Sequence, residues 1–114
     1  MAFKQNNHGT ATAKIIKSIA RKLKEKYKAE KIILFGSYAE GNPRKDSDID
    51  LLIIKKTKAR HIDRAVLVRK ILKDENRIVA IDTLVYTPDE INKRLKLEDD
   101  FVKNILDNGA VLYG

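Results

Sequence analysis

Two aspartates one residue apart, directly before an apolar run, are the first sign of chemistry in this chain. Asp48 and Asp50 flank Ile49 and lead into the run from Leu51 to Ile54. Side chains alternate between the two faces of a strand, so both carboxylates point the same way if the segment is extended. Neighbouring carboxylates repel each other unless a cation lies between them. Because oxygen ligands with no nearby cysteine or histidine suit Mg²⁺ or Mn²⁺, the pair predicts a site for such a cation; a solvated turn is the alternative.

A glycine and a serine that could bind phosphate precede this pair, with ten residues between the two motifs. Gly36 follows an apolar run, where it allows a sharp backbone turn and the close approach of a ligand. If Ser37 to Glu40 form a helical turn, its first N–H groups point at an anion and the serine hydroxyl adds a donor. Arg44 and Lys45, in the intervening loop, could contact a triphosphate or be solvated. A Gly-Ser pair alone is common in loops, so the prediction rests on the combination of both motifs.

The stretch from Ile32 to Ile54, IILFGSYAEGNPRKDSDIDLLII, resembles the signature of the DNA polymerase β-like nucleotidyltransferase superfamily. The short length and the wording GSYAEG…DSDIDLLII are similar to the minimal nucleotidyltransferases (MNT), the antitoxin partners of HEPN toxins. The resemblance extends roughly from Lys31 to Tyr113. One position departs from it, because relatives often have an arginine where this chain has Glu40. A phosphate or partner contact of that arginine would be absent or replaced, for example by Arg44.

A third acid, Asp82, interrupts an apolar segment between Ile81 and Thr83. An acid within such a strand is costly unless it is paired or binds a metal. If its strand lies beside the strand of Asp50, the three carboxylates share one face and could bind two Mg²⁺ ions. The resemblance supports this interpretation, since the family carries its third acid on such a strand. The alternatives are an edge-strand acid facing solvent, or one paired with an arginine such as Arg77.

The resemblance implies transfer of a nucleotide, in which a hydroxyl attacks the α-phosphorus of a nucleoside triphosphate and pyrophosphate leaves. Asp48, Asp50 and Asp82 would then be both metal ligands and catalytic residues, with Asp82 placed to accept the proton of the hydroxyl. Gly36 and Ser37 would bind the β- and γ-phosphates. Positioning and charge stabilisation would supply most of the rate enhancement.

Alternating strand and helix patterns predict a single α/β domain. We expect a small sheet of three or four strands with helices packed mainly on one side, and the resemblance implies that this sheet is mixed. We expect a flexible tail over residues 1–11 and one nucleotidyltransferase domain over 12–114. Helices are predicted at residues 12–28 and 60–73 and from Thr87, which starts a capping box with Glu90, with a break near 98–100. Strands are predicted at 31–35, 49–54 and 78–86, a polar break at 73–77, and an extended tail at 110–113 that packs back on the body.

Composition limits the classes of protein that this chain can belong to. The 114 residues carry a formal net charge of +8 and no cysteine, which excludes disulfides and thiolate metal sites. There is no run of about 18 apolar residues and no apolar signal core, so we expect a cytoplasmic protein that does not bind membranes. Residues 1–31 contain nine basic and two acidic residues, which indicates either an anionic partner or a solvated helix face.

Three functions from different classes fit these observations. The leading hypothesis is an enzyme that transfers AMP from ATP to a protein acceptor; the resemblance implies an antitoxin whose target is a tyrosine of a cognate HEPN ribonuclease toxin. A non-catalytic antitoxin that only binds its toxin is the second, although it leaves the clustered carboxylates without a use. A nucleotidyltransferase acting on nucleic acid is the third, prompted by the positive charge but disfavoured by the few aromatic residues available for base stacking.

Overall fold

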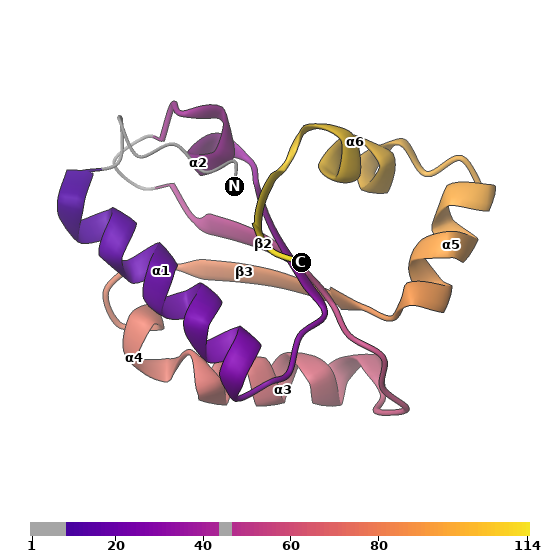
Figure 1. The fold of residues 1–114 in the computed structure, drawn as a ribbon, viewed down its shortest axis with the longest axis horizontal. Coiled ribbons are helices and arrows are strands. Elements are labelled where there is room, and N and C mark those ends of the chain that lie inside the picture. The colour runs from indigo at the N-terminus through magenta and orange to yellow at the C-terminus, as the bar shows by residue number, and fades with distance from the viewer. Residues whose placement is uncertain (1–8, 44–46) are drawn as a thin grey trace.

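A four-stranded sheet in the order β3-β2-β1-β4 forms the centre of the fold (Figure 1). The structure, a computed structural model, describes residues 9–43 and 47–114. β1 pairs antiparallel with both β2 and β4, whereas β3 runs parallel to β2. The expected mixed sheet is therefore confirmed. The strands are β1 (Lys31–Phe35), β2 (Ile49–Ile54), β3 (Ile81–Tyr86) and β4 (Ala110–Tyr113).

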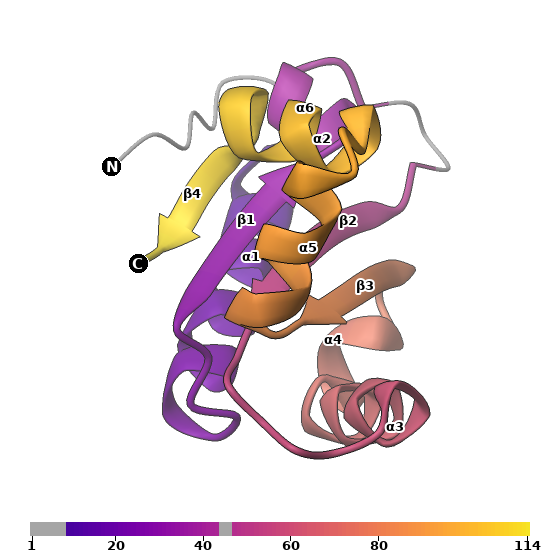
Figure 2. The same cartoon turned by 90° about the vertical axis from the view of Figure 1, so that its right-hand side faces the viewer.

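Helices cover both faces of this sheet. Among the described residues, the two longest helices lie on the same face, in line with the expectation that helices pack mainly on one side. Figure 2 shows α5 and α6 in front of the sheet and α1 behind it. The first face carries α1 (Gly9–Glu25), α3 (His61–Ile71) and α4 (Lys73–Asn76), and the second carries α5 (Pro88–Lys96) and α6 (Asp100–Asn108). The short α2 (Ser37–Glu40) follows the end of β1. No helix within residues 9–43 and 47–114 is long and apolar enough to cross a bilayer.

The central strand β2 is apolar on both faces because each face is covered. Leu51 and Ile53 belong to the core beneath α1 and α3, whereas Leu52 and Ile54 belong to the core beneath α5 and α6. Side-chain alternation therefore directs Asp50 to the same face as Leu52. Asp50 is the one polar residue in an otherwise buried strand.

Several boundaries differ from the sequence-based expectation, including those of α3, which spans His61–Ile71 instead of the predicted 60–73. α1 begins and ends three residues earlier than the predicted 12–28, and β3 begins at Ile81 instead of 78. The predicted polar break at 73–77 is largely the helical turn α4, because its Glu75 is buried and accepts hydrogen bonds from Ser18 (2.6 Å) and Lys22 (3.0 Å) of α1. A buried carboxylate is tolerated where charged and hydroxyl donors satisfy it.

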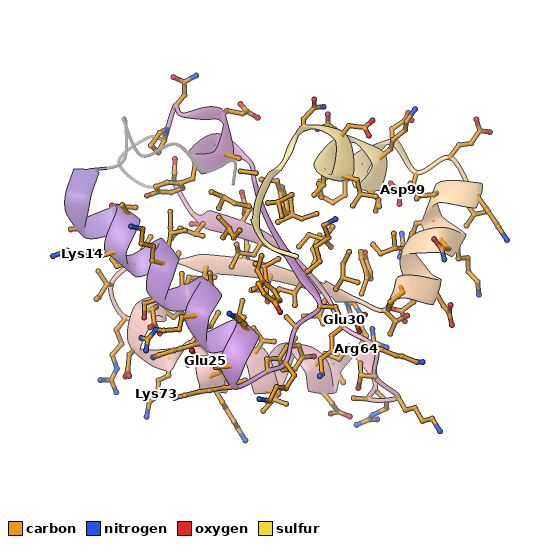
Figure 3. All side chains as sticks on the ribbon, viewed as in Figure 1. Lys14, Glu25, Glu30, Arg64, Lys73 and Asp99 are labelled. Carbon is orange, nitrogen blue, oxygen red and sulfur yellow. The ribbon has the colours of Figure 1, made fainter. Side chains whose placement is uncertain are left out.

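The end of the chain agrees with the local signals in the sequence. Thr87 and Glu90 form the predicted capping box at the start of α5, and the expected break separates α5 from α6. Asp99, in this connection, caps α6 by accepting a hydrogen bond from the Val102 N–H (Figure 3). The predicted extended tail is β4, which adds to the sheet beside β1.

Candidate active site

Gly36 connects β1 to α2 in a conformation that a residue with a side chain rarely adopts. Its φ of 75° and ψ of −157° lie in a region occupied almost only by glycine. A Cβ atom at this position would also collide with Oδ2 of Asp50. The backbone at the end of β1 and the carboxylate of β2 are therefore in direct contact, so the two sequence motifs meet at one place.

Two of the three predicted acids share one face of the sheet, and the third directly precedes strand β2. Asp50 and Asp82 are directly paired on the neighbouring parallel strands β2 and β3, so their side chains emerge on the same side. Asp48 precedes Asp50 by two residues. Asp50 is half-buried, whereas Asp48 and Asp82 are exposed. The strand order places Asp50 in the middle, with Asp82 on one side and Gly36 on the other.

The charge of Asp50 is not compensated by any neighbouring cation among the described residues. Burial raises the pKa of the Asp50 carboxyl above its ordinary value, and the negative charges of Asp82 and Asp48 raise it further. None of the ion pairs in the described part of the chain involves these three acids. A bound cation would stabilise the ionised form of all three carboxylates.

The donor set suits a hard divalent cation, although its side chains do not converge. Within the described ranges, no three His, Cys, Asp or Glu residues lie close enough together to bind a metal as they stand. The oxygen-only chemistry of Asp48, Asp50 and Asp82 nevertheless matches Mg²⁺. Since Asp48 and Asp82 are exposed, they can rotate toward Asp50 without repacking the core. These are the residues that could bind such an ion.

Asp82 also fits part of the alternative interpretation, in which it is a solvent-facing acid of an edge strand. β3 is an edge strand, and the Asp82 side chain is exposed. No ion pair joins it to Arg77 in the segments that the structure covers. Its register with Asp50 and its effect on the pKa of that residue distinguish it from an ordinary surface acid.

The predicted helical turn after Gly36 is present as α2. No side chain caps its start, and Gly41 ends it in a left-handed conformation with φ of 81° and ψ of 11°. Half-buried Ser37 is its first residue, so its hydroxyl lies at the helix start, where unbonded N–H groups favour an anion. Arg44 and Lys45, the two cations considered for the triphosphate, lie outside the described residues.

Sequence reasoning missed a cavity of about 280 Å³ beside Gly36, between α2 and α6. Glu40, the departure from the family pattern, lines it together with Phe101 and Asn104. The Phe101 side chain is 55% exposed, and its ring meets the Phe35 ring edge-on at 5.8 Å. No sequence signal reveals the cavity, because it depends on how α6 packs against the end of β1.

Comparison with known proteins decides the family. The sequence model of a protein family described as "Nucleotidyltransferase domain" matches residues 16–112. The chain belongs to this nucleotidyltransferase family. The superfamily resemblance and the predicted class of enzyme are thereby confirmed.

Individual relatives agree with this assignment. "Putative protein adenylyltransferase MJ0604" of Methanocaldococcus jannaschii is 38% identical over 102 residues, which cover 88% of this chain and 96% of that protein. A second protein of that organism, "Putative protein adenylyltransferase MJ1379", is 52% identical over 42 residues, or 33% of this chain and 42% of its own. The crystal structure of a "putative nucleotidyltransferase from Sulfolobus solfataricus" is similar with a TM-score of 0.52 and 25% sequence identity, and the match covers 70% of this chain and 70% of that chain. The nucleotidyltransferase fold is therefore shared with a solved structure.

Proposed function

We propose that this nucleotidyltransferase transfers AMP from ATP to a hydroxyl group of a protein, with Mg²⁺ as its cofactor. The observation that supports it best is the pairing of Asp50 with Asp82, two acids beside the Gly36 backbone, whose conformation suits the close approach of a phosphate. The relatives named as protein adenylyltransferases support the choice of a protein acceptor.

In the proposed reaction, the acceptor oxygen forms a bond to the α-phosphorus of ATP and the bond to the α–β bridging oxygen breaks. Pyrophosphate leaves with the electron pair, and Asp82 accepts the proton of the acceptor hydroxyl. Gly36 and Ser37 bind the β- and γ-phosphates. Two Mg²⁺ ions, bound by Asp48, Asp50 and Asp82, would supply charge neutralisation and lower the pKa of the hydroxyl.

The strand order gives this reaction a direction. In an in-line displacement the nucleophile and the leaving group lie on opposite sides of phosphorus. The pyrophosphate lies toward Gly36 and Ser37, on the β1 side of Asp50. The acceptor must then approach from the β3 side, where exposed Asp82 lies on the open edge of the sheet.

We further propose a tyrosine of a cognate HEPN-type toxin as the acceptor, with this chain as its antitoxin. The sequence resemblance to MNT antitoxins supports this partner. A tyrosine hydroxyl has a pKa of about 10, so it needs a nearby cation and a base such as Asp82 to attack at neutral pH.

The test is to incubate the chain with ATP, Mg²⁺ and the purified product of the adjacent gene, and to weigh both proteins by mass spectrometry. We expect AMP increments on a tyrosine of the neighbour with the wild type, and none with Asp82→Asn. Asp107→Asn, which changes an exposed acid of α6, is the matched control and should transfer normally. Equal transfer by Asp82→Asn would remove this residue from the site. Neutralisation of the neighbour without a mass change would favour simple binding, and AMP on added RNA would favour a nucleic-acid acceptor.

A further inference from the structure

The outer face of α3 and α4 carries a surface hollow with apolar and basic residues that the proposed chemistry does not use. It has a volume of about 450 Å³, and we call it the α3 groove; its lining residues are Val66, Arg69, Lys70, Lys73, Asn76 and Arg77. Val66 is 48% exposed, and Ile62, one helical turn before it, is 63% exposed. The spacing of Ile62, Val66, Arg69, Lys70 and Lys73 puts them on one side of a helix. In Figures 1 and 2, α3 lies at the margin of the molecule.

The charges around the α3 groove are unbalanced. The acids of this segment are already paired, since Asp63 binds Arg60 and both Asp74 and Glu75 bind Lys22. By contrast, the four cations of the groove form no ion pair with any described residue; they are Arg69, Lys70, Lys73 and Arg77. Figure 3 shows Lys73 at the outer rim of the molecule. A positive rim around exposed apolar atoms is complementary to an acidic surface with an apolar side chain at its centre.

The α3 groove adjoins the edge strand that carries Asp82. A smaller hollow of about 120 Å³ lies between α3 and the edge strand β3, and its lining includes Arg69, Asn76 and Asp82. Arg69 and Asn76 therefore line both hollows. The Asp82 side chain itself emerges on the other face of the sheet, with Leu84. A protein bound in the α3 groove would therefore lie beside β3 and reach Asp82 around the open edge of the sheet, the side from which in-line attack requires the acceptor to come.

The edge of β3 is itself poorly suited to bind an extended partner strand. The Ile81 N–H donates to Oδ1 of Asn76, and the Val85 carbonyl accepts from the guanidinium of Arg64, which is also paired with Glu90. Both ends of the edge are thus capped by side chains, as in proteins that avoid strand addition. Recognition on this side is left to the surface of α3 and α4.

We propose that the α3 groove is the docking site for the acceptor protein, which binds it through an acidic surface with an apolar side chain entering the groove. The proposal rests on the proposed AMP transfer for the nature of the partner. The exposed apolar residues favour a protein over a nucleic acid, whose phosphates would contact the cations but leave Ile62 and Val66 uncovered.

The test uses charge reversal with a matched control. The variant Lys70→Glu/Lys73→Glu reverses two positive charges of the α3 groove, and Val66→Asp puts a negative charge at its exposed apolar residue. The control, Lys93→Glu/Lys96→Glu, makes the same double charge reversal with the same spacing in the last turn of α5. Each is made in the Asp82→Asn chain so that the acceptor stays unmodified. Binding of the adjacent gene's product and of a single-stranded oligouridylate is measured by isothermal titration at near-physiological salt, with an ATP analogue and Mg²⁺ titrated separately.

We expect both groove variants to weaken binding of the neighbouring protein by about tenfold or more, since like charges then face each other. The α5 control should stay within about twofold of its parent, and binding of the ATP analogue should not change. Unchanged affinity of the groove variants, binding of RNA alone, or no binding of either probe by the parent would overturn the proposal.

A second measurement separates the docking hypothesis from the proposed AMP transfer. The same groove variants are made in the chain that retains Asp82, and AMP transfer to the neighbouring protein is measured. Full AMP transfer by the reversed groove would refute docking while the proposed reaction stands. Groove-dependent binding without any AMP transfer by the wild type would refute the reaction while the docking surface stands.

Discussion

Substitution of Gly36 by alanine tests the contact that joins the two halves of the candidate site. The change adds one methyl group where two costs arise. The backbone at φ 75° and ψ −157° is unfavourable for any residue with a Cβ, and the new atom would overlap Oδ2 of Asp50. We therefore expect a loss of both stability and AMP transfer.

The magnitude follows from these two costs. Holding a non-glycine residue in such a backbone conformation costs about 1–3 kcal/mol, and overpacking costs about 1–3 kcal/mol more. Because the colliding atom is the far end of the half-buried Asp50 side chain, which can shift, we expect a total in the lower part of the summed range, about 3 kcal/mol. For a domain of this size, that loss corresponds to a decrease in Tm of about 12 °C. Gly41→Ala is the control in the same loop. Gly41 has an ordinary left-handed conformation, which an alanine can adopt at a cost of about 1–2 kcal/mol.

Urea unfolding of a double-mutant cycle separates the two costs. Asp50→Ala removes the carboxylate but leaves Cβ, which lies an ordinary 3.5 Å from the position of the added methyl group. In this background Gly36→Ala should cost only the backbone part, about half of the total. The reasoning is refuted if Gly36→Ala costs the same in both backgrounds, or no more than Gly41→Ala.

Three further predictions concern individual side chains. Ser37→Ala should weaken binding of an ATP analogue with Mg²⁺, measured by isothermal titration, by about 1.5–3 kcal/mol without lowering Tm; equal affinity would remove the hydroxyl from the site. Asp82→Asn should change the pH dependence of unfolding. Because the folded chain binds the proton of Asp50 more tightly than the unfolded chain does, wild-type stability falls as pH rises from the ordinary Asp range through the raised pKa, and the variant should show a smaller fall.

Glu75→Gln should destabilise the fold by about 1.5–3 kcal/mol at neutral pH, since the buried carboxylate accepts from Ser18 and Lys22. Burial opposes ionisation of Glu75, but these hydrogen bonds outweigh it and lower its pKa. Its contribution is therefore present above the ordinary Glu range and is lost as pH falls. Urea unfolding of wild type and variant across this range should converge at acidic pH, and a constant difference would contradict the assignment.

Local signals in the sequence were sufficient for most elements. The bounds of β1 and β2 agree with the two apolar runs around the Gly-Ser and Asp-x-Asp motifs, and Thr87 starts α5 with its capping box. These features depend on periodicity, caps and backbone preferences, which act over a few residues. The prediction erred at α4, because the burial of Glu75 depends on Ser18 and Lys22, more than fifty positions away.

The sequence by itself determined the two apolar strands β1 and β2, the turn that begins with Gly36 and Ser37, and the presence of Asp48, Asp50 and Asp82 at or near strands. Only the tertiary structure decided that β3 pairs parallel to β2 with Asp82 opposite Asp50, and that Gly36 contacts this carboxylate. The same packing put the α3 groove beside the open edge of the sheet. Register and helix packing are set by burial of apolar residues distant in the chain, so no local pattern specifies which polar groups are brought together.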